Sequence, residues 1–267
     1  MSSMILSARH FLAPSQKTTH YHDCHQIIYI TRGAATIQVN GSVRTAQQGD
    51  LVIFSRFEHH CVTANSDDYQ RYVLHIAPHS SSGSETGYQL FSILSNRPAG
   101  FSNVLDIHEK SGEIEHLLRR MVDECASAQL LRDQQLDLLL QELLICIYRH
   151  FPEPFSVFSE DSLETVLRIQ NRFENNYREP FSLAELAEEY GVSVSYLSHQ
   201  FKRITGNSVM GYLQSCRIAA AKKYLAETTM GISQIVEECG FSDSSNFSRT
   251  FKSITGCSPT QFRQKYN

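Results

Sequence analysis

The last third of the chain contains two similar stretches, LAEEYGVSVSYLSHQFKRITG at residues 186–206 and IVEECGFSDSSNFSRTFKSITG at residues 235–256. Gly191 in the first stretch matches Gly240 in the second at an offset of 49 residues, whereas the closing Thr-Gly pairs match at an offset of 50. One inserted residue accounts for the difference. Similarity over some twenty positions indicates a duplicated structural unit.

Each stretch has the pattern of a helix, a tight turn and a second helix. Gly191 and Gly240 suit the left-handed residue that follows a helix end, because glycine has no Cβ to clash there. Ser193 and Ser242 are expected to cap the second helices, since a serine side chain accepts hydrogen bonds from the first backbone N–H groups. The sequence therefore predicts two helix-turn-helix units in tandem.

The second helix of each unit has an apolar and a polar face. The residues expected to be buried are Leu197, Phe201, Ile204, Phe247, Phe251 and Ile254. The opposite faces carry short polar residues near the helix start and a longer donor one turn later, as a helix entering the major groove requires. His199 and Arg249 are these longer donors, and Lys202, Arg203 and Lys252 suit phosphates. The pattern predicts binding to double-stranded DNA, with a plain helical bundle as the alternative.

The segment from Phe181 to Tyr266 resembles the DNA-binding domain of AraC-type transcriptional regulators. The matching pieces are SLAELAEEYGVS, YLSHQFKRITG, RIAAAKKYLAET, IVEECGFSDSSNFSRTFK and TGCSPTQFRQKY. The resemblance implies seven helices, with a long linking helix that holds two recognition helices about one DNA turn apart. It implies base-reading roles for Val194, Ser195, Ser198, His199, Ser244, Ser245, Ser248 and Arg249. In this sequence His199 replaces a frequent arginine, and Asn246 replaces a frequent aromatic residue.

Bulk properties fit a globular regulator of two domains. The net charge of −4 divides unevenly: residues 1–161 carry 12 basic against 18 acidic side chains, and residues 162–267 carry 12 against 10. No apolar run is long enough for a membrane helix, and the N-terminus lacks the pattern of a secretory signal. Seven cysteines without CxxC spacing predict reduced thiols. We therefore expect a cytoplasmic protein with no membrane partner.

The chain before the repeat predicts an α+β arrangement. Short β-branched runs separated by turns, among them HQIIYI, ATIQV, DLVIF and YVLHI, predict an antiparallel β-barrel sensor at residues 1–80. A helical extension at 81–151 follows, which begins with a loop and one helical turn at 79–100. FPEPF at 151–155 stops this extension, because proline has no N–H to continue a helix, and the expected linker is 152–162. The all-α DNA-binding domain is then 163–267.

A dense leucine-rich stripe lies on the last helix before the linker. Its members are Leu136, Leu139, Leu140, Leu143, Leu144 and Ile147. Their helical spacing predicts one apolar face. That face serves either a homodimer interface, as is common among AraC-type regulators, or packing against the β-barrel.

Two segments of the first eighty residues resemble cupin motifs. HYHDCHQIIYITRG at 20–33 is similar to the first motif, and GDLVIFSRFEHH at 49–60 is similar to the second. Strand alternation predicts that His20, His22 and Gln26 share one face. With His60 from the second motif they form the candidate effector site. The motif's usual acid is Gln26 here, and its usual proline and glycine fall on Ser55 and Phe57.

Three interpretations of this site fit the residues. His20, His22 and His60 could hold a divalent metal, the cavity could take an organic effector, or the histidines could form internal hydrogen bonds alone. Further polar contacts are expected from Tyr29, Arg71 and Tyr72, whereas His25 and His59 are expected to point to solvent.

The resulting prediction is a transcriptional regulator, not an enzyme, that binds DNA and a small effector such as a sugar or another metabolite. The alternatives are a metal-dependent cupin enzyme fused to a DNA-binding domain and a ligand-independent DNA-binding regulator. An enzyme would need a metal with open coordination positions, and the glutamine at position 26 argues against it.

Overall fold

The chain forms two compact units, Met1–Leu163 and Glu164–Asn267, which are described separately. The structure is a computed structural model that describes residues 3–13, 19–39, 41–78, 85–97, 101–152 and 160–266. Most of the linker expected at 152–162 therefore lies outside the described residues. Among the described helices, none combines the length and the apolar character that crossing a bilayer demands.

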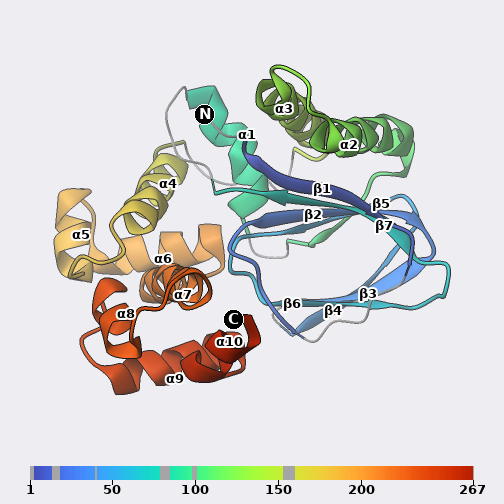
Figure 1. Ribbon diagram of the computed structural model, residues 1–267. Coiled ribbons are helices and arrows are strands. Elements are labelled where there is room, and N and C mark those ends of the chain that lie inside the picture. Colours follow the sequence, from blue (N-terminus) through green and yellow to red (C-terminus); the bar gives the residue numbers. More distant parts are fainter. Residues whose placement is uncertain are drawn as a thin grey trace. The chain divides into compact units, whose positions relative to one another are not determined.

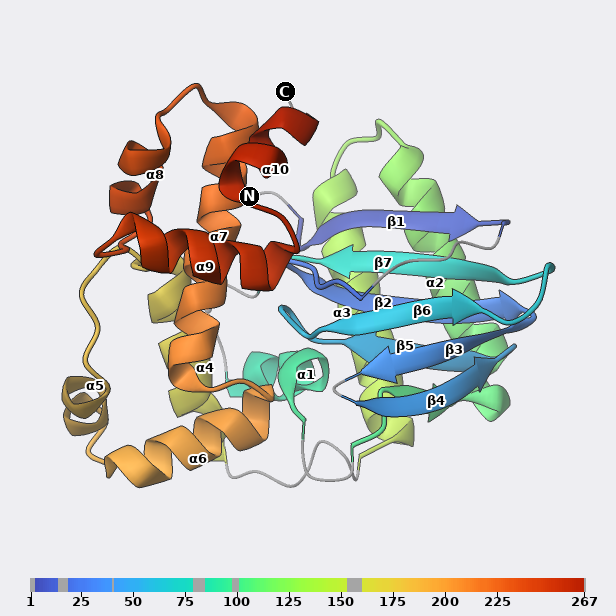
Figure 2. The same ribbon diagram turned by 90° about the horizontal axis from the view of Figure 1, so that it is seen from below.

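The first unit is built on two antiparallel sheets (Figures 1 and 2). The larger sheet has the strand order β1-β7-β2-β5-β8, and the smaller has the order β4-β3-β6. The strands are β1 (Ile5–Phe11), β2 (His25–Arg32), β3 (Ala34–Val39), β4 (Ser42–Gln47), β5 (Asp50–Phe54), β6 (His60–Ala64), β7 (Gln70–Ile76) and β8 (Val104–Asp106). A hairpin joins β3 to β4, and Gly41 in its turn has a φ of 83°.

Strand β2 shows why the sheet is buried on both faces. Successive side chains of a strand point in opposite directions. Ile28 and Ile30 lie in the core between the two sheets, whereas Ile27 and Tyr29 lie in a second core under the helices. The almost continuous apolar run of this strand therefore fills two cores.

Four helical segments complete the first unit, namely α1 (Glu85–Ser95), the 3-10 helix η1 (His108–Lys110), α2 (Ser111–Ala126) and α3 (Arg132–His150). Helices α2 and α3 cover the outer face of the larger sheet (Figure 1). The expectation of a single helical turn in 79–100 is wrong, because α1 has 11 residues. The leucine-rich stripe packs inward: its members from Leu136 to Ile147 are at most 2% exposed, so they are unavailable for a dimer interface.

Seven helices make up the described part of the C-terminal region. They are α4 (Glu160–Asn175), α5 (Leu183–Glu189), α6 (Val194–Thr205), α7 (Val209–Glu227), α8 (Ile232–Glu238), α9 (Ser244–Thr255) and α10 (Pro259–Tyr266). The 19-residue helix α7 contacts α6, α8, α9 and α10 (Figure 2), and its N-cap Ser208 accepts a hydrogen bond from the Gly211 N–H. Helix α7 thus links the two helix pairs.

Candidate functional site

Each predicted recognition helix begins at a capped N-terminus and ends at a glycine. Ser193 caps α6 by accepting a hydrogen bond from the Tyr196 N–H at 3.2 Å. Helix α9 is capped by Asp243, whose carboxylate accepts from the Asn246 N–H at 2.6 Å. The expectation that Ser242 caps this helix is therefore wrong by one residue, because the inserted residue of the second turn shifts the start of the helix.

The two recognition helices bury one face and expose the other. Leu197, Phe201, Ile204, Phe247 and Phe251 are buried, and Ile254 is half-buried rather than fully buried. The predicted base-reading residues Val194, Ser195, His199, Ser244, Ser245, Ser248 and Arg249 are exposed, and Ser198 is half-buried. The local sequence thus places these side chains on the solvent face of each helix.

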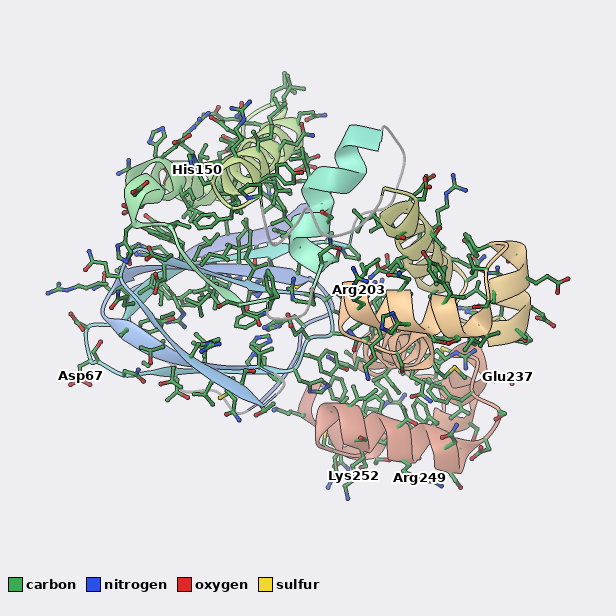
Figure 3. The ribbon with its side chains drawn as sticks, turned by 180° about the vertical axis from the view of Figure 1, so that it is seen from behind. Asp67, His150, Arg203, Glu237, Arg249 and Lys252 are labelled. Carbon is green, nitrogen blue, oxygen red and sulfur yellow. The ribbon has the colours of Figure 1, made fainter. Side chains whose placement is uncertain are left out.

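The basic residues lie toward the C-terminal ends of the same helices. Lys202 and Lys252 are exposed, and Arg203 is half-buried. Figure 3 shows Arg249 and Lys252 projecting from α9, while Arg203 projects from α6. Each exposed face therefore presents short polar groups, one longer polar side chain and nearby cations.

Acidic residues on the preceding helices are paired with arginines of the same unit. Glu189 on α5 forms an ion pair with Arg172, and Glu238 on α8 lies 2.8 Å from Arg178. The pairing of these glutamates with arginines offsets part of the negative charge that would oppose a phosphate backbone.

Sequence reasoning missed Tyr196, which is 47% exposed on α6, because an aromatic residue in a short helix is usually expected to be buried.

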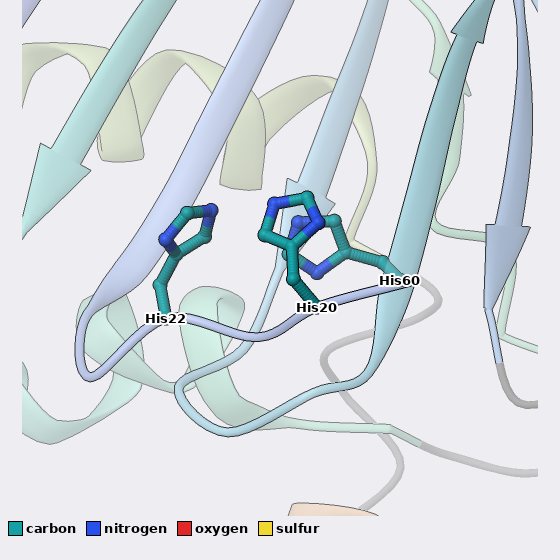
Figure 4. A group of neighbouring side chains, drawn as sticks. All are labelled: His20, His22 and His60. Atoms are coloured by element: carbon teal, nitrogen blue, oxygen red, sulfur yellow. The ribbon is translucent and has the colours of Figure 1, made fainter. Parts of the chain in front are cut away.

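The histidines of the two cupin-like segments converge in the first unit (Figure 4). His20 and His60 form an isolated antiparallel bridge, with backbone N–O distances of 3.0 and 2.8 Å. One ring nitrogen from each of His20, His22 and His60 lies within 4.8 Å of the others. His60 is buried and stacks on Phe54 at a centroid distance of 3.8 Å. Three imidazoles in this arrangement fit a divalent ion that favours nitrogen ligands.

Gln26 does not complete a metal site as the acid of the cupin motif would. Its side-chain nitrogen lies 2.8 Å from Nε2 of His75, and Nδ1 of His75 lies 3.0 Å from the Ser7 hydroxyl. Sequence reasoning missed His75. The strand register could have found it, since Gln26 on β2 is directly opposite His75 on β7.

A cavity of about 140 Å³ lies beside these residues. Its polar lining residues are His20, Gln26, His60, Arg71 and His75, and its apolar lining residues are Phe11, Ile28, Val62 and Val73. The structure thus brings three of the four predicted effector residues to one cavity, while His22 contacts the same cluster from beside it. The cavity combines a cationic group with apolar walls.

Arg71 is 5% exposed and lies between two aromatic rings. Its guanidinium carbon is 4.9 Å from the ring centroid of Phe11 and 5.0 Å from that of Tyr69, and one nitrogen donates to the Ala13 carbonyl at 3.3 Å. Burial lowers the pKa of Arg71 and the neighbouring Tyr69 opposes this change, yet a guanidinium remains charged in proteins.

Other expectations for this region are corrected. Tyr29 faces the helices, where its hydroxyl lies 3.5 Å from the Ser111 carbonyl, and burial raises its pKa to about 12. Tyr72 stacks on His10 on the same side of the sheet. His25 is buried, and its Nδ1 accepts a hydrogen bond from the Arg56 N–H, whereas His59 is exposed as expected. Of the three further polar contacts expected, Arg71 lines the cavity and the two tyrosines do not.

A buried ion pair shapes the turn that presents His60. Glu58 accepts hydrogen bonds from Arg97 at 3.0 Å and from the Ser55 N–H at 2.8 Å. Burial alone would raise the pKa of the Glu58 carboxyl, but Arg97 and the hydrogen bonds hold it below its ordinary value. Phe57, which replaces the motif's glycine, has a φ of 62° in this turn. Sequence reasoning missed Glu58 and Arg97, because buried charges are rare and their pairing across 39 residues leaves no local pattern.

Comparisons with known proteins agree with this geometry. Residues 8–144 match the family described as AraC-like ligand binding domain, and residues 186–265 match a helix-turn-helix domain family. The HTH-type transcriptional activator RhaR of Shigella dysenteriae serotype 1 (strain Sd197) is 25% identical over 258 residues, which cover 91% of this chain and 86% of that protein. RhaR of Escherichia coli (strain K12) is 24% identical over 255 residues, with the same two coverages.

A solved structure shows the same fold. ToxT from Vibrio cholerae matches with a TM-score of 0.60 at 14% identity, over 98% of this chain and 99% of that chain. The RhaR relatives are transcriptional activators, and the prediction of a regulator rather than an enzyme is confirmed on that ground. The chain belongs to the AraC family of transcriptional regulators, with an AraC-like ligand-binding domain followed by a helix-turn-helix DNA-binding domain.

Proposed function

We propose that a small effector, bound in the cavity of the first unit, controls how this AraC-family regulator reads DNA. The observation that carries the proposal is the cavity itself, where a buried arginine and three imidazoles adjoin apolar walls. A β domain that only had to be stable would need an apolar core and no cavity lined by polar side chains. One structure of ToxT from Vibrio cholerae strain SCE256 is described as bound to an unsaturated fatty acid, so a protein of this fold takes a small ligand.

The DNA contacts are assigned to the exposed faces of α6 and α9. Val194, Ser195, Ser198 and His199 would read one half-site, and Ser244, Ser245, Ser248 and Arg249 would read the next. Lys202, Arg203 and Lys252 would bind phosphates, which position the protein without reading sequence. Because one helix offers histidine where the other offers arginine, each subunit is expected to prefer an asymmetric site.

A homodimer is the assembly we propose. The outer face of α3 exposes Leu138 and Ile145, which are 60% and 36% exposed, and the N-cap residue Leu131 just before the helix is 62% exposed. Leu138 and Ile145 are seven apart, the spacing at which residues of one helix face the same partner helix. The neighbouring Gln134 and Gln141 are exposed and uncharged, and the exposed Glu142 on the same face lies 4.0 Å from Arg120 of α2, which offsets part of its charge.

Selection of bound DNA from a random pool tests the proposal. The full chain is incubated with the pool alone, and in parallel with each member of a set of candidate metabolites. We expect one enriched motif with two unequal half-sites, whose enrichment changes when one metabolite is present. If no motif is enriched under any condition, sequence-specific DNA binding is contradicted. If one motif is enriched identically in every condition, effector control by this set is contradicted.

A further inference from the structure

The lining of the cavity indicates the chemistry of its ligand. We propose that the cavity binds a small organic carboxylate, with the carboxylate on Arg71 and the carbon part against the apolar walls. This inference rests on the proposed function, in which the same cavity holds the effector, and it names the effector's chemical class.

Charge is the first argument. Among the described residues that line the cavity, none carries a carboxylate, whereas Arg71 carries a permanent positive charge. The fixed charge of the lining is therefore positive. A guanidinium also presents its N–H groups in a planar fork that matches the two oxygens of a carboxylate.

The position of Arg71 is the second argument. It lies on β7, where its backbone is paired with Phe11 of β1 and Ile30 of β2, so its main chain is held within the larger sheet. The rings of Phe11 and Tyr69 and the Ala13 carbonyl hold its head group. A donor that is already oriented loses less side-chain entropy when a ligand arrives, which favours binding.

The remaining lining selects a small and largely apolar ligand. The imidazoles of His20 and His60 lie at the same cavity and can offer N–H donors to an anion, while Ile28, Val62 and Val73 suit hydrocarbon. A sugar would place hydroxyl groups against these apolar walls, where the hydroxyls would lack hydrogen-bond partners. A volume of about 140 Å³ is below the roughly 300–1,000 Å³ of pockets that hold drug-sized ligands. The ligand is thus a short carboxylic acid rather than a polyhydroxylated one.

Matched pairs of probes test the charge requirement. The full chain is titrated by calorimetry with butanoate, hexanoate and benzoate, and with butanamide, hexanamide and benzamide, at neutral pH and matched ionic strength. At least one carboxylate should bind at least about tenfold more tightly than its amide, since a hydrogen bond between two charged groups contributes more than one to a neutral amide. If every amide binds as tightly as its acid, or if neither series binds, the proposal is overturned. This comparison uses the wild-type chain, so it does not depend on how a variant folds.

Substitution then tests the residue. Arg71→Met should weaken the carboxylate about tenfold or more, while Arg9→Met, which changes an exposed arginine of β1, should leave the affinity unchanged. Circular dichroism checks that each variant is folded, and Arg71→Lys, which keeps the positive charge, should retain part of the affinity. If Arg71→Met binds as wild type does but a chelator abolishes binding, a metal on the histidine cluster holds the anion and the assignment to Arg71 is wrong.

The carboxylate inference and the proposed function can fail separately. If the DNA selection enriches a motif that responds to an uncharged metabolite and the carboxylates do not bind, the carboxylate class is wrong and the regulator stands. If the carboxylates bind through Arg71 but the selection enriches no motif, the cavity assignment stands and sequence-specific regulation is contradicted.

Discussion

Arg249 and His199 occupy equivalent positions, 50 residues apart, on the exposed faces of the two recognition helices. An arginine can make two hydrogen bonds to the O6 and N7 atoms of guanine, whereas a histidine makes fewer. We expect Arg249→Ala to weaken binding to the selected DNA by about 1–3 kcal/mol and to relax base preference at one position. Gel-shift titration against site variants measures both effects. Unchanged affinity together with unchanged base preference would contradict the assignment of α9 as a reader.

Lys252 is exposed on the same helix, in its last turn, and is assigned to a phosphate. A phosphate contact carries no base information but releases condensed counterions. Lys252→Ala should therefore weaken all DNA sequences alike and reduce the slope of log affinity against log salt by about one. Titration at several salt concentrations measures the slope. A loss confined to one sequence would instead make Lys252 a base reader.

Glu58 and Arg97 form an ion pair that is buried on both sides, with side-chain exposures of 6% and 8%. Glu58→Gln removes the negative charge and leaves the buried guanidinium uncompensated, which typically costs about 3–5 kcal/mol. We expect a clear fall in the free energy of unfolding of the first unit, measured by urea denaturation. Asp68→Asn, which disrupts the exposed Arg32–Asp68 pair, is the control and should leave the denaturation midpoint unchanged. Equal effects of the two substitutions would show that the Glu58 pair adds no stability of its own.

At the scale of elements, the duplicated helix-turn-helix units provide a matched pair of glycines. Gly191 and Gly240 have φ angles of 64° and 73°, in the left-handed region that strains any residue with a Cβ by roughly 1–2 kcal/mol. A Cβ on Gly191 would meet nothing within 4 Å, but a Cβ on Gly240 would lie 2.7 Å from the Arg178 carbonyl oxygen. Gly240→Ala should therefore lower the thermal midpoint of the second unit more than Gly191→Ala does. The opposite order would mean that the backbone at Arg178 yields easily.

Sequence patterns predicted the elements whose signal is local. The repeat predicted α5, α6, α8 and α9, the family resemblance supplied the linking helix α7, and short apolar runs predicted β2, β3, β5 and β7. Strands β1, β6 and β8 were missed as individual elements, because their sequences are short or largely polar and depend on partners distant in sequence. Helix α1 was expected to be only one helical turn after a loop, since the preceding Ser/Gly stretch suggested a loop.

The residues that motif spacing identifies could be predicted from the sequence. Which face of an element is buried against the rest of the fold could not. His20, His22 and His60 were identified from the cupin-like segments, and the structure brings them together. The inward packing of the leucine-rich stripe could not be decided, because a helical stripe looks the same against a sheet or against another subunit. The cap at Asp243 was missed for a similar reason, since Ser242 and Asp243 are both good caps and the backbone alone chooses between them.

At the scale of the whole chain, charge separates the two roles. The first 161 residues carry six more acidic than basic side chains, whereas the last 106 carry two more basic than acidic ones. Since non-specific DNA binding follows positive charge, the acidic first unit discourages it, and the small excess of basic side chains lies in the part of the chain that holds the helix-turn-helix units. Arg71 is a buried positive charge in this acidic unit, and no carboxylate lies among the described residues that line its cavity, which is consistent with a role toward a ligand rather than toward DNA.

The proposed dimer is the last consequence at this scale, and it depends on the outer face of α3 rather than on the leucines that pack inward. Leu138 is more exposed than Ile145 on this face, at 60% against 36%, so its replacement leaves the core intact. Leu138→Glu would place like charges opposite each other in a symmetric interface and should convert the protein to a monomer. Sedimentation velocity measures the assembly, and Val43→Glu, on a 59% exposed residue of β4, is the control that should remain dimeric. Because two linked subunits raise the effective concentration of the second DNA-binding domain at a repeated site, the Leu138 variant should also lose cooperative binding to a double site while it retains binding to a single one. A Leu138 variant that stays dimeric would place the interface on another surface.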